Sequence, residues 1–184
     1  MPLDLSHFAP EVMALLQDVD ARPMPLTKES TPSDQAHTML STPARNLFPV
    51  ARSPEASLAG LLLYLGHWKD AHEVAQDLGS AEGSYWHAIV HRMEPDAWNS
   101  KYWFKRVGEH AIFPDLLNAT SAIASTDPNG TMRLGSHWSP AAFVDFCEEA
   151  RLSPGSRQER MAVEIQHAEW KLLMAWCAGP HNQR

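Results

Sequence analysis

Apolar residues recur at spacings of three and four along most of the chain, the spacing that places side chains on one face of an α-helix. Runs in which β-branched residues alternate with polar ones are absent from the sequence. The clearest helical stripe lies near the C-terminus, where Met161, Ile165, Ala168, Leu172 and Trp176 share one face. The pattern predicts an all-α fold.

Helix boundaries are marked by capping residues and by prolines. Ser53 and Ser139 each precede a proline that can occupy the first helical position, and Gly66 and Gly108 follow apolar runs where a helix would end. From these signals we expect about eight helices, counted from their caps: 10 to before Pro23, 53–65, 68–78, 80–94, 96–107, 114–125, 139–151 and 156–178. Short connections predict an irregular bundle of antiparallel hairpins forming one domain over residues 1–184.

The prolines cluster in residues 22–53, which excludes one regular element there. The same segment carries more apolar side chains than a solvated linker would, namely Met24, Leu26, Met39, Leu40, Leu47, Phe48 and Val50. We therefore expect residues 22–53 to wrap over the core as an irregular but ordered strap.

Charge and composition exclude several classes of function. Lys and Arg total 15 against 22 Asp and Glu, a formal charge of −7, so nucleic acid is not expected as a partner. No apolar run approaches the roughly 20 residues that span a bilayer, and the N-terminus carries Asp4 where a signal peptide needs basic charge. Cys147 and Cys177 lack C-x-x-C spacing, which fits a reducing compartment. These features predict a cytoplasmic protein with no membrane partner.

Cys147 is expected to be a buried structural thiol whose pKa is raised by the acids around it.

Side chains suited to chemistry gather in residues 64–110. This quarter of the chain holds five of the ten His, four of the seven Trp and all three Tyr. Such side chains combine large contact area with polar tips, so their clustering indicates a functional centre in this segment.

Two motifs in this segment resemble those of a known group of proteins. Residues 83–94 read GSYWHAIVHRME, and residues 99–108 read NSKYWFKRVG. They are similar to the GSYWHAI-HR-E and N-KYWFRRVG signatures of a group of uncharacterised bacterial and fungal proteins, over roughly residues 60–115. That group has no assigned activity, so the resemblance implies a functional centre without implying a reaction.

One interpretation of this centre is a metal site. His87, His91 and Glu94 follow at i, i+4 and i+7, which places them on one helical stripe beside the apolar face of Trp86, Ile89, Val90 and Met93. Two imidazoles and a carboxylate could hold Zn²⁺, Mn²⁺ or Fe²⁺, with His72 or His110 added from a neighbouring element. The sequence has neither H-E-x-x-H nor paired E-x-x-H motifs.

Two other interpretations stay open. In one, the same stripe with Arg92 forms the polar floor of a small-molecule pocket, in which His87, His91 and Glu94 are the candidate acid–base residues. The predicted ligand-binding residues are then Tyr85, His87, His91, Arg92, Tyr102 and Trp103. In the other, the histidines form a structural hydrogen-bond network with adjacent helices.

The leading functional hypothesis is a helical protein that binds a small molecule at a His- and aromatic-lined site, with a divalent metal as candidate cofactor. Whether it is an enzyme stays open. The alternative is an interaction module, because residues 62–78 resemble a tetratricopeptide-like hairpin, with a helix that ends at Gly66 and Ala71 five positions later. Its partner would be another protein or a second copy of the chain.

Overall fold

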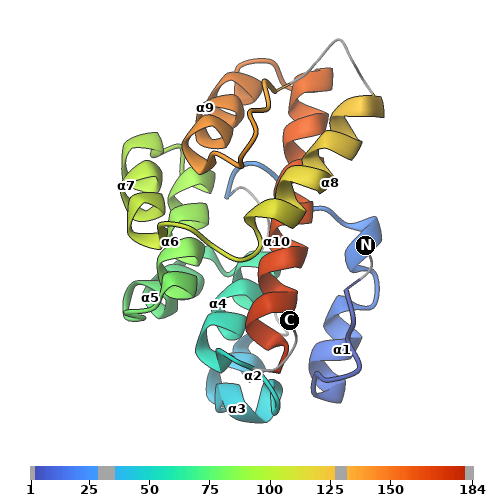
Figure 1. Ribbon diagram of the computed structural model, residues 1–184. Coiled ribbons are helices and arrows are strands. Elements are labelled where there is room, and N and C mark those ends of the chain that lie inside the picture. Colours follow the sequence, from blue (N-terminus) through green and yellow to red (C-terminus); the bar gives the residue numbers. More distant parts are fainter. Residues whose placement is uncertain (1–2, 29–35, 127–131, 181–184) are drawn as a thin grey trace.

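The computed structural model describes residues 3–28, 36–126 and 132–180, and these residues contain helices and no strand (Figure 1). The expected all-α class is confirmed. The elements are α1 (Pro10–Leu16), a 3₁₀ turn (Val19–Ala21), α2 (Ala36–Ser41), α3 (Ala44–Leu47), α4 (Pro54–Tyr64), α5 (Trp68–Gln76), α6 (Ala81–Met93), α7 (Ala97–Val107), α8 (Phe113–Thr126), α9 (Pro140–Arg151) and α10 (Arg157–Ala178).

The eight expected helices correspond to α1 and α4–α10, and most of their ends agree within two residues. Four of the helices begin at a capping side chain. The side-chain oxygens of Ser80, Asp96, Ser139 and Ser156 accept hydrogen bonds from backbone N–H groups at 3.1–3.3 Å. Ser53 is the N-cap residue of α4, followed by Pro54 at the first helical position as predicted, but the Ser53 side chain makes no capping hydrogen bond. Its backbone N–H instead donates to the carbonyl of Cys177 at 2.9 Å, which ties this turn to the end of α10.

The Pro-rich strap is more regular than expected. It contains the short helices α2 and α3, which occupy stretches without internal prolines. Most of its apolar side chains are buried, with Met24, Leu26, Met39, Leu47 and Phe48 at most 3% exposed. Leu40 and Val50, in contrast, are exposed. Residues 29–35 of the strap lie outside the described residues.

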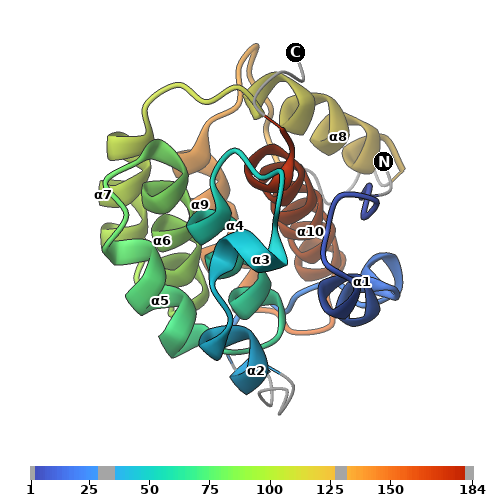
Figure 2. The ribbon, with the colours of Figure 1, turned by 90° about the horizontal axis from the view of Figure 1, so that it is seen from below.

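The longest helix, α10, runs through the middle of the molecule and packs against α4, α8 and α9 (Figure 2). Helices α5, α6 and α7 lie on one side of it, and α1 and α8 lie on the other (Figure 2). The chain from α4 to α7 packs each helix against the next, which forms the predicted antiparallel hairpins. Among the described helices, none has both the length and the apolar composition needed to cross a bilayer.

Helix α6 is enclosed on all sides. The expected apolar face is confirmed, because Trp86, Ile89, Val90 and Met93 are at most 2% exposed. Every other residue from Gly83 to Met93 is buried as well. The polar stripe of α6 therefore lies inside the bundle, where its members need partners from other helices.

Candidate metal centre

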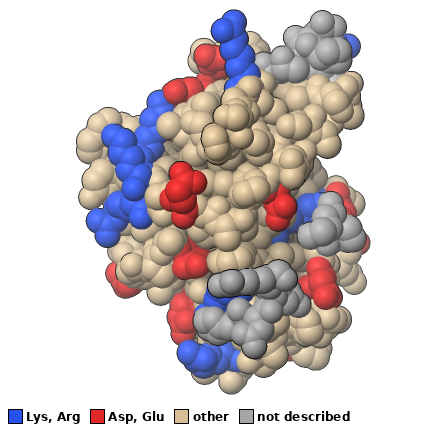
Figure 3. All heavy atoms as spheres, in the orientation of Figure 1, with Lys and Arg blue, Asp and Glu red and all other residues tan. Residues whose placement is uncertain are grey.

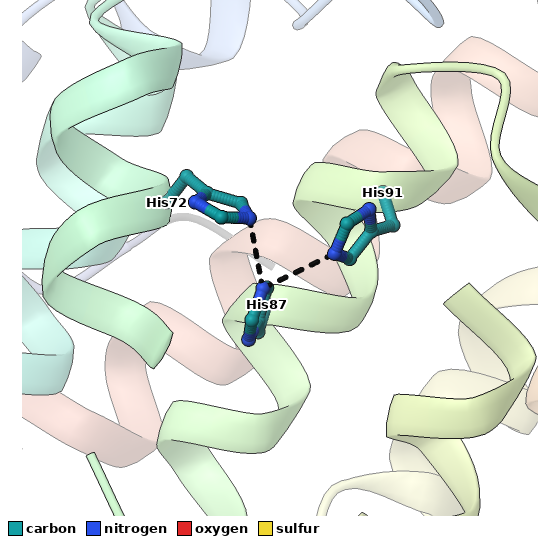
Figure 4. Close-up of side chains that lie close together, drawn as sticks. All are labelled: His72, His87 and His91. Atoms are coloured by element: carbon teal, nitrogen blue, oxygen red, sulfur yellow. Dashed lines mark hydrogen bonds between the residues drawn. The ribbon is translucent and has the colours of Figure 1, made fainter. Parts of the chain in front are cut away.

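Three imidazole rings converge between α5 and α6. His72 comes from α5, and His87 and His91 come from successive turns of α6 (Figure 4). Nε2 of His87 lies 3.0 Å from Nε2 of His72 and 3.1 Å from Nε2 of His91. Each ring offers one nitrogen to a group in which all three nitrogens lie within 4.8 Å of one another. We call these three residues the histidine triad.

The local sequence explains this arrangement. The i, i+4 spacing of His87 and His91 places both rings on one stripe of α6. The four-residue link 77–80 returns the chain directly, so α5 packs against α6. On α5, the buried side chains of Ala71 and Ala75 are small enough to let neighbouring helices approach closely. His72 is thereby brought to the two histidines of α6.

Two tryptophans flank the triad. The ring of Trp68 stacks on that of His72, with centroids 5.7 Å apart, and the ring of Trp103 lies 4.0 Å from that of His87. The indole Nε1 of Trp68 also donates to the carbonyl of Val90 at 3.4 Å, which fixes α5 to α6. These aromatic side chains cover two of the rings and lower the local dielectric.

Burial keeps the rings of α6 neutral. Desolvation, followed by the charges of His72 and His91, lowers the pKa of His87 to about 3. The pKa of His91 is lowered by burial and by His72, against the opposing carboxylates of Asp96 and Glu94. A neutral imidazole carries one lone pair, which is the form that binds a metal ion.

Glu94 does not lie among the converging nitrogens. Its Oε2 is 3.6 Å from Nδ1 of His91, on the opposite side of that ring, and Oδ2 of Asp96 is 3.8 Å from the same atom. The other carboxylate oxygen of Glu94 accepts from Lys28 Nζ at 3.1 Å. Both distances exceed hydrogen-bond range, and Nδ1 of His91 has no hydrogen-bond partner among the described residues. The two carboxylates therefore act on this ring through their negative charge.

His110, the other histidine considered as a ligand, lies elsewhere. Its ring contacts those of Tyr85 and Trp176, with centroids 5.2 and 5.6 Å away, and its Nδ1 accepts from the backbone N–H of Ile112 at 3.3 Å. The chain turns after α7 at Gly108, which has a positive φ of 66°, and continues toward α8 and α10. His110 lies in this connection and is therefore apart from the triad.

Two of the expected ligand-binding residues, Arg92 and Tyr85, belong instead to a buried network of an ion pair and hydrogen bonds. Arg92 is fully buried and forms an ion pair with Glu169 of α10, which is also fully buried. The Tyr85 hydroxyl donates to Glu169 at 3.0 Å, and Arg92 Nε donates to Gln166 at 3.4 Å. Arg92 also lies 4.6 Å from the ring centroid of Phe143. These contacts join α6 to α9 and α10, so Tyr85 and Arg92 serve packing at this position.

The remaining expected ligand-binding residues separate as well. Trp103 lies against the triad, whereas Tyr102 is 44% exposed and lines a different cavity with the start of α9. The sequence prediction missed Glu169 and Gln166, because no local pattern marks them as partners of a residue about 75 positions earlier.

Cys147 is buried and reduced, as expected. Its pKa is raised to about 11, and the main cause is burial, with Glu169 also raising it and Arg92 lowering it. The direction agrees with the prediction, but the acids next to Cys147 in the sequence are not the cause.

No family model matches the chain, and no curated protein or solved structure shows significant similarity to it. The geometry of the triad is therefore the basis for a functional proposal.

Proposed function

We propose that the protein binds one divalent transition-metal ion through Nε2 of His72, His87 and His91. The observation that carries this proposal is the convergence of ring nitrogens of His72, His87 and His91, which all lie within 4.8 Å of one another. Around a tetrahedral Zn²⁺ with Zn–N bonds of about 2.0–2.1 Å, ligand nitrogens are separated by about 3.3 Å. Two of the separations here, 3.0 and 3.1 Å, are close to that value, and the third, between His72 and His91, lies within 4.8 Å, so the rings would move together on binding the ion.

Hydrogen bonding alone accounts poorly for this cluster. Nε2 of His87 faces two other Nε2 atoms at hydrogen-bond distance. One ring nitrogen carries either a proton or a lone pair, so it cannot donate to one neighbour and accept from the other. A metal ion would accept the lone pairs of all three rings at once.

The donor set favours Zn²⁺ and Fe²⁺ over Mn²⁺, and of the two Zn²⁺ generally binds such a site more tightly. Imidazole ligands suit Zn²⁺ and Fe²⁺, whereas Mn²⁺ prefers oxygen ligands. Three histidines also leave a coordination position for water or a small molecule, as in catalytic zinc sites. A water bound there would have a pKa of about 7 and could act as a nucleophile. The proposed function is thus metal-dependent binding of a small molecule, with hydrolysis or hydration as the chemistry this site would support.

Glu94 and Asp96 act in this proposal as positioning residues. Their negative charges lie 3.6 and 3.8 Å from Nδ1 of His91 and would favour the tautomer with the proton on Nδ1, which leaves the lone pair of Nε2 for the metal.

The interaction-module hypothesis has one supporting observation. Helices α4, α5 and α6 pack in succession, and Gly66 takes a positive φ of 81° between the first two. If the protein is an interaction module, the histidines are structural, and added metal would not stabilise the protein.

The test is elemental analysis of protein purified without a histidine tag, combined with Zn²⁺ titration after chelation. The wild type should hold about one equivalent of metal, and added Zn²⁺ should raise its Tm, because a bound ion stabilises the folded state. The double variant His87→Ala, His91→Ala should lose both effects. His72→Ala, on the more exposed member of the triad, gives a variant less prone to misfold, and His137→Ala at an exposed position is the matched control. Metal-free protein whose stability does not respond to Zn²⁺ would contradict the proposal.

A further inference from the structure

Lys28, in the strap of residues 22–53, contacts both helices that carry the histidine triad. Its Nζ donates to Oε1 of Glu94, which follows the last residue of α6, at 3.1 Å. The same ammonium lies 4.4 Å from the ring centroid of Trp68, the first residue of α5. The backbone N–H of Lys28 donates to the carbonyl of Met93 at 3.2 Å. One residue of the strap therefore links the end of α6 to the start of α5.

Each side-chain contact of Lys28 leads to a histidine of the triad. The second carboxylate oxygen of Glu94, Oε2, lies 3.6 Å from Nδ1 of His91. The ring of Trp68 stacks on that of His72, with centroids 5.7 Å apart. Lys28 is thus one side chain away from two of the proposed ligands, which belong to different helices.

The strap is anchored just before Lys28. Leu26 is 3% exposed, and its carbonyl accepts from the guanidinium of Arg151 on α9 at 3.3 Å. The carbonyl of Pro25 accepts from the side-chain amide of Gln166 on α10 at 2.6 Å. Because these bonds already fix the backbone, the contacts of Lys28 lose less conformational entropy than those of an ordinary surface lysine.

The other cations near the triad belong to α7. Figure 3 shows Lys and Arg side chains gathered over this helix. Lys101 forms an ion pair with Asp145 of α9, and the guanidinium carbon of Arg106 lies 5.0 Å from the ring centroid of Trp103. Among the described residues, the Lys or Arg side chain that pairs with Glu94 is the one from the strap.

The ammonium of Lys28 acts on the site through its neighbours rather than by direct repulsion of an ion. Its side chain is 46% exposed, and its charge is paired with the Glu94 carboxylate. Water and this carboxylate screen the ammonium from an ion bound at the triad. Loss of the ammonium would therefore mainly free the Glu94 carboxylate and the Trp68 ring to change orientation. His91 and His72 would then lose part of the support that keeps their nitrogens close together.

We propose that Lys28 is a positioning residue for the metal ion, and that attachment of the strap is coupled to binding of the ion. This inference rests on the metal proposed at the triad. Lys28 holds Glu94 and Trp68, these two side chains act on His91 and His72, and the ion binds more tightly when the strap is attached. Coupling between two binding events is reciprocal, so the bound ion also stabilises the attached strap.

The first measurement is Zn²⁺ affinity, obtained by competition with a chromophoric chelator. Lys28→Met keeps the length of the side chain but removes its charge, and it should weaken binding about 5- to 10-fold, somewhat less than the loss of a residue that contacts a ligand directly. Lys28→Arg should keep most of the affinity, since a guanidinium can pair with a carboxylate and lie over an indole ring. The matched control is Lys69→Met on α5, which pairs with exposed Glu73 and should bind Zn²⁺ like the wild type.

The second measurement is hydrogen exchange by mass spectrometry, with and without Zn²⁺. In the wild type, Zn²⁺ should slow exchange in residues 24–28 more than in α1, which lies on the other side of α10 (Figure 2). In Lys28→Met this difference should disappear. With chelator present, Lys28→Met and Lys69→Met should have similar Tm values, which separates positioning of the ligands from general stability.

The results distinguish this inference from the metal proposal on which it rests. If the wild type binds no Zn²⁺, the metal proposal fails and the role of Lys28 fails with it. If the wild type and Lys28→Met bind Zn²⁺ equally well, the metal site stands and the role of Lys28 is overturned. An equal loss of affinity in Lys69→Met would also overturn it, because the effect would then depend only on net charge. So would a chelated Lys28→Met variant with a Tm well below that of Lys69→Met, or strap exchange that Zn²⁺ slows no more than that of α1.

Discussion

Nε2 of His87 lies 3.0 Å from Nε2 of His72, although the two rings belong to different helices. The contact depends on the close packing of α5 against α6, and it places a third imidazole beside the i, i+4 pair of His87 and His91. A pair of histidines on one helix is a common surface feature, whereas a third ring from a neighbouring helix creates a defined site. The predictions below test the helix packing, the buried ion pair, the protonation state and the site itself.

Gly60 of α4 is predicted to be intolerant of a side chain. A Cβ at this position would lie 2.6 Å from Cζ2 of Trp86, which is fully buried on α6. Because the indole has no free space, Gly60→Ala should lower the free energy of unfolding by about 1–3 kcal/mol. Trp86→Ala should cost about 3–5 kcal/mol by leaving a cavity. Urea unfolding of both single variants and the double variant measures the coupling, and additive losses would show that the two positions do not interact.

Breaking the ion pair of Arg92 and Glu169 should destabilise the protein strongly, whereas replacing both residues with apolar ones should destabilise it much less. Both side chains are fully buried, so Glu169→Gln leaves an uncompensated charge and should cost about 3–5 kcal/mol. Replacing both residues with apolar ones, Arg92→Met with Glu169→Leu, should cost much less than the single change. The matched control is Glu73→Gln, which removes an exposed partner of Lys69 and should cost at most about 1 kcal/mol. A Glu169→Gln variant as stable as this control would contradict the buried network.

Stability without metal should fall as the pH is lowered. His87 has a pKa of about 3 in the folded protein, below the ordinary histidine value of about 6.5 expected in the unfolded chain. Below pH 6.5 the unfolded state takes up a proton that the folded state does not bind until near pH 3, so the free energy of unfolding decreases across that window. Burial lowers the pKa values of His91, His110 and His167 in the same direction.

The measurement is urea unfolding with chelator present at pH 7.5, 6 and 5. His87→Gln should show a shallower loss than the wild type over this range, and His137→Gln, an exposed control, should follow the wild type. Equal stability of the wild type at pH 7.5 and pH 5 would contradict the neutral, buried state of His87 and His91.

The sequence alone predicted the features that depend on residues close together in the chain. The spacing of His87 and His91, the apolar face of Trp86 and the cap at Ser80 all depend on residues within one or two turns, and the structure places each as expected. Ser53 also lies at the predicted N-cap position, but its side chain makes no capping bond, and its backbone N–H donates to Cys177 of α10, a contact that no local pattern indicates. Local signals thus predicted most helices and one stripe of the site.

The rest of the site depends on tertiary packing. His72 and His110 were equivalent candidates along the chain, and only the packing of α5 against α6 brings His72 to the triad. The partner of Arg92 is likewise set by α10, which lies far along the sequence. Glu94 shares the stripe with His91, but its position one turn onward carries its carboxylate to Nδ1 rather than to Nε2.

The central claim is that His72, His87 and His91 bind one metal ion through imidazole nitrogens, and the most direct test is X-ray absorption at the zinc edge. Protein loaded with one equivalent of Zn²⁺ should show a first shell of nitrogen and oxygen at about 2.0–2.1 Å, with outer-shell scattering from three imidazoles. His72→Ala should reduce that scattering to two imidazoles. A first shell containing sulfur at about 2.3 Å, or an imidazole count unchanged by His72→Ala, would contradict the account.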